Sequence, residues 1–86
     1  MRWLKTYNET RISFDSIEQF MITNLCSIGW VEYCNVTAFT TTGEEILVIS
    51  NVPYQNALDF LDELDQIIES DFHGVVDVKA VLKTVG

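Results

Sequence analysis

Apolar and polar residues alternate along parts of this 86-residue chain, as they do in β-strands. Residues 3–14 predict either one long strand or a hairpin that turns near Asn8 and Glu9. Residues 30–40 and 45–50 are rich in β-branched and aromatic side chains, and a short loop separates them, so they predict an antiparallel hairpin. The second of these strands contains the run Ile-Leu-Val-Ile, which is apolar on both faces and predicts a central position in a sheet.

Two other stretches have the spacing of an amphipathic helix. In residues 15–28 the apolar positions are Ile17, Phe20, Met21, Leu25 and Ile28. Asp15 and Glu18 have the spacing of a capping box, and Gly29 suits a left-handed helix stop, so this segment is predicted to be the first helix. The second helix is predicted to begin near Pro53. Its apolar arc contains Ala57, Phe60, Leu61, Leu64, Ile67 and Ile68.

The end of the chain alternates again and predicts a last strand over residues 75–85. The resulting order, βαββαβ, is the split βαβ, ferredoxin-like pattern. This α+β fold has two helices on one face of a four-stranded antiparallel sheet, and one small acidic domain is expected to cover residues 1–86. Its core is expected to contain Ile17, Phe20, Leu25, Val48, Leu61, Leu64, Ile68, Val78 and Leu82.

Charge is distributed unevenly along the chain. Its five basic residues are Arg2, Lys5, Arg11, Lys79 and Lys83, whereas the stretch from Ile12 to Val78 contains twelve of the thirteen acidic residues and no Lys or Arg. The net charge of −8 repels nucleic acid and attracts cationic surfaces over about a Debye length, roughly 8–10 Å in ordinary salt. We therefore expect no direct nucleic-acid binding and a protein partner that carries a basic surface.

The predicted second helix carries the densest group of acids, and these are the candidate partner-binding residues: Asp59, Asp62, Glu63, Asp65 and Glu69. One interpretation is a solvated face that only keeps the protein in solution. The other is an electrostatic contact surface, with a nucleic-acid mimic or small phage-type inhibitor of a nucleic-acid-binding enzyme as its most specific form. A second candidate contact is an apolar patch of Ile22 and Cys26, which the predicted first helix would direct outward.

Signatures of enzymes and cofactor sites are missing from the sequence. It contains no glycine-rich phosphate loop or serine elbow, and Cys26 and Cys34 do not form a Cys-x-x-Cys pair. His73 cannot complete a tetrahedral zinc site with these two cysteines unaided. We therefore expect a non-enzymatic protein without a cofactor or metal. The alternative is a small regulatory domain that forms a homodimer through its sheet and binds a small ligand.

The location of the protein is also predicted from what the sequence lacks. The N-terminal residues contain no apolar run of the kind found in signal peptides. No segment approaches the roughly 20 apolar residues of a membrane span. The two cysteines do not suggest a disulfide framework, so a reducing, cytoplasmic setting without membrane contact is expected.

Overall fold

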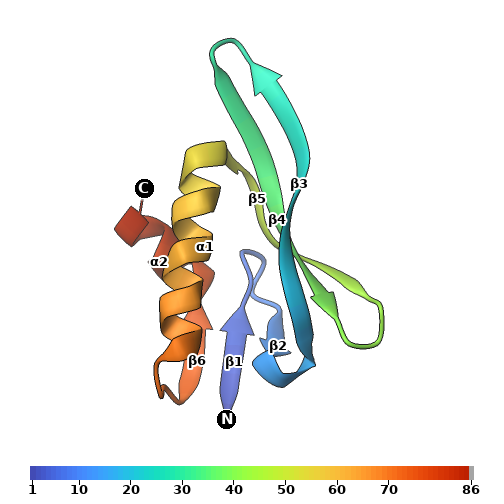
Figure 1. The fold of residues 1–86 in the computed structure, drawn as a ribbon, viewed down its shortest axis with the longest axis vertical. Helices are drawn as coiled ribbons and strands as arrows, with labels where there is room; N and C mark the ends of the chain where they lie inside the picture. Colours follow the sequence, from blue (N-terminus) through green and yellow to red (C-terminus); the bar gives the residue numbers. More distant parts are fainter. Residues whose placement is uncertain (86) are drawn as a thin grey trace.

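The computed structural model describes residues 1–85 and shows an α+β fold in which these residues form two three-stranded sheets and two α-helices (Figure 1). The first sheet has the order β2-β1-β6 and consists of β1 (Arg2–Lys5), β2 (Arg11–Ser13) and β6 (Gly74–Asp77). The second has the order β3-β4-β5 and consists of β3 (Ile17–Ile28), β4 (Val31–Thr40) and β5 (Glu45–Pro53). The helical elements are the 3-10 turn η1 (Phe14–Ser16), α1 (Tyr54–Glu69) and α2 (Val78–Val85).

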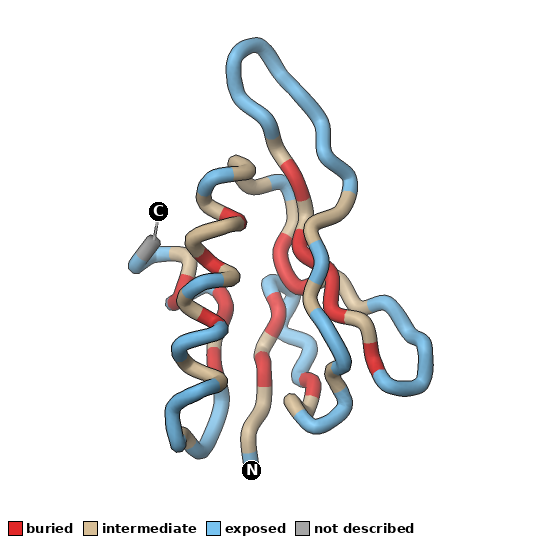
Figure 2. The backbone as a smooth tube through the Cα atoms, in the orientation of Figure 1, coloured by how far each residue is buried: buried red, intermediate tan, exposed pale blue. Residues whose placement is uncertain are grey.

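The core lies where α1 packs against the two sheets, and Figure 2 shows buried residues on α1, β1, β4 and β5 facing this interior. Leu4 and Phe60 are completely buried there. Of the predicted core residues, Val48, Leu64 and Val78 are buried, whereas the following are half-buried and pack against the core: Ile17, Phe20, Leu61 and Leu82. Ile68 is half-buried. The prediction for Leu25 is wrong, because its side chain is 58% exposed.

The predicted hairpin of residues 30–40 and 45–50 is confirmed as the antiparallel pair β4 and β5. The start of the chain is also a hairpin rather than one long strand, because β1 and β2 pair antiparallel. The central position predicted for β5 is wrong, since β4 is the middle strand of that sheet. Instead, the backbone N–H of Tyr7 donates a hydrogen bond of 2.9 Å to the carbonyl of Val48, which joins the two sheets at β5.

The helix predicted for residues 15–28 is wrong, because this segment is η1 followed by the long strand β3. The predicted cap at Asp15 is also wrong, because Ser13 caps the turn: the Asp15 backbone N–H donates a hydrogen bond of 3.3 Å to Ser13 Oγ, and the helical turn ends at Ser16. The register of β3 against β4 shifts between Ile17 and Gln19 and again between Thr23 and Cys26. These irregularities break the strict alternation of a strand, so the apolar residues recur at spacings of three and four that resemble a helix.

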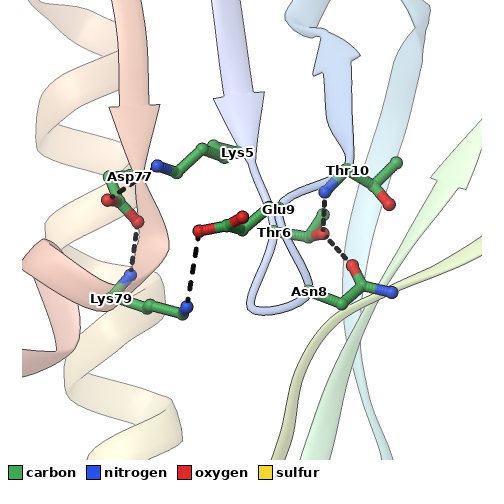
Figure 3. Close-up of polar contacts among 7 residues, drawn as sticks. All are labelled: Lys5, Thr6, Asn8, Glu9, Thr10, Asp77 and Lys79. Atoms are coloured by element: carbon green, nitrogen blue, oxygen red, sulfur yellow. Dashed lines mark hydrogen bonds and ion pairs between the residues drawn. The ribbon is translucent and has the colours of Figure 1, made fainter.

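The strand predicted for residues 75–85 is confirmed only as far as Asp77, and the rest is the helix α2. The Lys79 backbone N–H donates a hydrogen bond of 3.0 Å to Asp77 Oδ1, so Asp77 caps α2 at its N-terminus (Figure 3). β6 lies beside β1, and the pair is parallel. Two three-stranded sheets therefore replace the expected four-stranded antiparallel sheet, and the ferredoxin-like order is not present.

The β3–β4 hairpin gives the molecule its elongated shape of 42 × 28 × 21 Å (Figure 1). Its end extends beyond α1 and β5, and residues 24–32 there are exposed (Figure 2). Gly29, at φ +63°, occupies the first central position of the two-residue turn between Ile28 and Val31, where a type II′ hairpin requires glycine. Within residues 1–85, neither helix has the length and apolar character to span a membrane.

Candidate functional site

The five acidic residues predicted to bind a partner lie on α1, but they do not form one continuous face. At about 100° per residue, Asp62 and Glu69 lie opposite the buried arc of the helix, and both are exposed. Asp59 and Glu63 lie on one flank and are half-buried. Asp65 lies on the other flank, where it lines a cleft. The helix therefore presents its carboxylates in three directions.

The cleft beside Asp65 has a volume of about 470 Å³ and lies between α1 and the segment formed by η1 and the start of β3. Its apolar lining consists of Phe14, Ile17, Phe20, Leu61 and Ile68. Two more carboxylates, those of Asp15 and Glu18, line it together with Asp65. We call this site the acidic cleft. It combines a surface for aliphatic or aromatic groups with three groups that attract a cation.

Arg2 also lines the acidic cleft, and it is held against the wall by its own contacts. One guanidinium nitrogen, Nη2, donates a hydrogen bond of 2.7 Å to the carbonyl of Ile68. The guanidinium carbon lies 4.5 Å from the centroid of the Phe72 ring and 5.8 Å from that of Phe14. These two rings pack edge to face with centroids 5.7 Å apart. Arg2 is thereby stabilised by backbone and aromatic groups instead of by a carboxylate.

The carboxylates of the cleft have no ion-pair partner in the part of the chain that the structure describes. The ion pairs there join Lys5 to Asp77 and Lys79 to Glu9, with N–O distances of 3.3 and 3.9 Å. Three carboxylates face one cation in the cleft lining, so the local charge is negative. A cationic group that entered the cleft would therefore meet unneutralised acids beside apolar surface.

A second unusual surface is the hairpin tip, which we define as residues 25–31. The side chain of Trp30 is fully exposed, and that of Ile28 is 62% exposed. Leu25 and Val31 are exposed as well. Large apolar side chains gathered on a protein surface often mark a contact with another molecule.

The predicted patch of Ile22 and Cys26 is only partly present. Both residues lie on β3 rather than on a helix, where Ile22 pairs with Val36 and Cys26 with Tyr33. Ile22 is half-buried and packs against the core, so the prediction that it faces outward is wrong. Cys26 is an exposed free thiol in the hairpin tip. Of the two predicted residues, only Cys26 therefore belongs to an exposed apolar surface, and that surface is the hairpin tip.

The remaining titratable side chains offer little reactive chemistry. Cys34 is a buried free thiol, and its burial raises its pKa, which keeps it protonated and unreactive. Among residues 1–85, no three His, Cys, Asp or Glu side chains gather as a metal site would require. The acidic cleft and the hairpin tip are therefore the two surfaces on which a function can be argued.

Comparison with protein families, with curated proteins and with solved structures finds no match to this chain.

Sequence reasoning found Asp65 but missed the partners that make it part of a cleft. Asp15 and Glu18 were interpreted as a helix cap, and Arg2 as one member of a basic terminus. The apolar residues beside Asp15 and Glu18, Phe14 and Ile17, form a local pattern that is visible in the sequence. No local signal places that pattern against α1, because the two segments meet only through the packing of β3 on β4 and of α1 on the sheet.

Proposed function

We propose that this protein is a non-enzymatic interaction module whose acidic surface binds a basic surface on a protein partner. The observation that carries the proposal is the acidic cleft, where Asp15, Glu18 and Asp65 line an apolar groove and have no ion-pair partner among residues 1–85. A Lys or Arg side chain from a partner fits this combination, because its aliphatic stem packs on apolar groups while its charge meets carboxylates. Asp62 and Glu69, exposed on the adjacent helix surface, extend the negative field toward the partner.

The more specific form of the proposal is inhibition of a nucleic-acid-binding enzyme, in the manner of a small phage-type inhibitor or nucleic-acid mimic. Such enzymes bind phosphates through clusters of Lys and Arg, and these clusters attract any dense group of carboxylates. The support is the net charge of −8 together with the exposed carboxylates of α1. The same proposal includes a cytoplasmic location, a protein as the partner, and no direct binding of this chain to nucleic acid.

The alternative, a regulatory domain that dimerises through its sheet and binds a small ligand, stays a prediction. Measuring the binding affinity at different ionic strengths distinguishes the two functions. Binding that depends on carboxylates weakens as salt screens the charges, whereas apolar contacts between sheets do not weaken in this way.

The experiment begins with affinity capture on the immobilised full chain from an extract of the native host, followed by binding measurements with the purified partner. The test variant is Asp62→Lys combined with Glu69→Lys. A matched control is Glu44→Lys combined with Glu45→Lys, which changes the net charge equally at exposed positions of the β4–β5 turn. We expect the α1 variant to bind at least about tenfold more weakly than the control, because charge pairs at a contact contribute roughly 1–3 kcal/mol each.

A cleft variant distinguishes the groove from the outer surface of the helix. Asp65→Lys reverses an exposed charge in the cleft lining, and we expect it to reduce binding even at high salt, because a cationic group of the partner would meet a like charge at short range. The proposal is contradicted if the α1 and control variants lose affinity equally, since net charge alone would then explain the binding. A partner whose affinity does not change with salt would also contradict it.

A further inference from the structure

We infer that a second copy of this chain pairs with the free edge of β3, so that two β3–β4 hairpins form one continuous antiparallel sheet across a two-fold axis. β3 pairs with β4 on one side and with no strand of residues 1–85 on the other. At 12 residues it is about twice the typical strand length of 5–6 residues. Its outer N–H and C=O groups therefore form a long row that is available to another strand.

The edge lacks most of the features that prevent strands from pairing between molecules. Natural edge strands are protected by lysine, proline, a short length or a bulge. β3 contains no lysine or proline, and its one charged residue, Glu18, lies at its start. It contains two register shifts, one between Ile17 and Gln19 and one between Thr23 and Cys26, where Asn24 has φ +53°. The regular stretch from Gln19 to Thr23 is continuous and can pair with its own copy.

The distribution of charge favours a second copy over a basic partner at this edge. Residues 19–31, which we call the neutral strip, contain no charged side chain, although the chain carries a net charge of −8. A basic partner would find no carboxylate on the strip to pair with. Two copies of the chain, in contrast, repel each other wherever carboxylates face carboxylates, and along the neutral strip this repulsion is least. An antiparallel strand edge is also complementary to itself about a two-fold axis.

The side chains of the strip provide apolar surface for such a contact. Met21, Leu25, Ile28 and Trp30 are all exposed in the single chain. Pairing of the edges would bring these side chains close to those of the second copy and remove part of their surface from water. Trp30 in particular is an aromatic residue of the kind that is enriched in protein contacts.

Self-association through the neutral strip and the proposed binding to a basic partner overlap only at the start of β3, where Gln19 and Phe20 also line the acidic cleft. The two proposals remain distinguishable, because their test variants change different residues. They also depend on salt in opposite directions. Salt screens the repulsion between two copies that each carry −8, so self-association should strengthen as salt is added. Binding of a basic partner through the acidic cleft should weaken. Failure of one proposal therefore leaves the other unaffected.

The experiment is sedimentation velocity of the full chain from about 10 to about 500 µM, at about 50 mM and about 500 mM NaCl. We expect a monomer–dimer equilibrium that shifts toward dimer at the higher salt. The strip variant is Met21→Lys combined with Leu25→Lys, which places two exposed charges on β3. The control is Thr10→Lys combined with Thr41→Lys, which makes the same change in net charge at exposed positions elsewhere.

Both variants reduce the net charge from −8 to −6 and so reduce overall repulsion. We expect the strip variant alone to weaken dimerisation, by at least about tenfold in the dimer dissociation constant. Circular dichroism establishes that both variants are folded, and if the strip variant is not, Thr23→Lys replaces it. A chain that stays monomeric at about 500 µM in high salt overturns the inference, as does equal dimerisation of both variants. A monomer that co-floats with phosphatidylcholine vesicles would instead assign the strip to a lipid surface.

Discussion

Lys5 and Asp77 face each other across the parallel strands β1 and β6, with Lys5 Nζ 3.3 Å from Asp77 Oδ2 (Figure 3). The other carboxylate oxygen of Asp77 accepts the backbone N–H of Lys79 and caps α2. Lys79 Nζ in turn lies 3.9 Å from an oxygen of Glu9 in the β1–β2 turn. The two basic ends of the chain are thus brought together around one acidic side chain, and this contact predicts a dependence of stability on pH.

These contacts lower the pKa of Asp77, first through the Lys79 backbone hydrogen bond and then through the charge of Lys5. A carboxyl whose pKa is lower in the folded state stabilises the fold above its ordinary pKa of 3.8, and this contribution is lost as pH falls through the folded value. Asp77→Asn removes the titration. We expect thermal melts at neutral pH to show the parent as more stable, with the difference shrinking below pH 3.8. A difference that is constant with pH would contradict the role of the Asp77 charge.

Leu64 is 1% exposed, at the centre of the contact between α1 and the sheets. Leu64→Ala should lower the free energy of unfolding by roughly 2–5 kcal/mol, because it leaves a cavity in a small core. Leu25→Ala is the matched control, since Leu25 is 58% exposed on β3. Its effect should stay within about 0.5 kcal/mol in urea denaturation. A large loss for Leu25→Ala would restore the core position that the sequence predicted for it.

Arg2 contributes to stability through its fixed guanidinium rather than through its charge alone. Arg2→Lys keeps the charge but loses the planar group that lies over the Phe72 ring and reaches the carbonyl of Ile68. We expect urea denaturation to show a loss of roughly 1–2 kcal/mol. Arg11→Lys, at an exposed position of β2, should change stability by less than about 0.5 kcal/mol. Equal effects of the two substitutions would show that charge alone accounts for Arg2.

The charge-reversal variant Asp62→Lys with Glu69→Lys should fold, and it should be more stable than the parent at low salt. Each substitution replaces a like-charge pair with Asp65 by an attractive one, and such pairs on a helix contribute roughly 0.2–0.5 kcal/mol. Added salt should diminish the gain. Urea denaturation at low and high salt measures it, and a destabilised variant would show that these carboxylates have a structural role.

The sequence predicted α1 and the β4–β5 hairpin because their signals are local. The apolar arc of α1 repeats over about three turns, from Ala57 to Ile68, and no strand arrangement could bury it on one side. The four residues between Thr40 and Glu45 allow only an antiparallel return. The strong negative charge of the body and the acids of α1 also follow from the sequence alone.

The helix predicted for residues 15–28 and the strand predicted beyond Asp77 are wrong for the same physical reason. Each segment contains local signals that are compatible with both a helix and a strand. Gly29 has the positive φ expected of a helix stop, yet a positive φ is also what the first central position of a type II′ hairpin turn requires. Asp77 ends one strand and caps a helix. In the segment that follows, Val78, Val81 and Leu82 have helical spacing, whereas Val78, Ala80 and Leu82 have the alternation of a strand. In β3, pairing with β4 outweighed the helical spacing, since β4 offers backbone partners along the whole segment.

The candidate sites, like the fold, were predictable from the sequence only in part. The sequence alone determined that the chain is acidic, that its carboxylates are densest on α1, and that residues 19–31 carry no charge. Only the tertiary structure decided that Asp65 meets Asp15 and Glu18 around an apolar groove, and that Trp30 stands fully exposed at the end of a projecting hairpin. The reason is that composition and local spacing are properties of one segment, whereas a cleft or a free strand edge depends on which segments pack together and which remain without a neighbour.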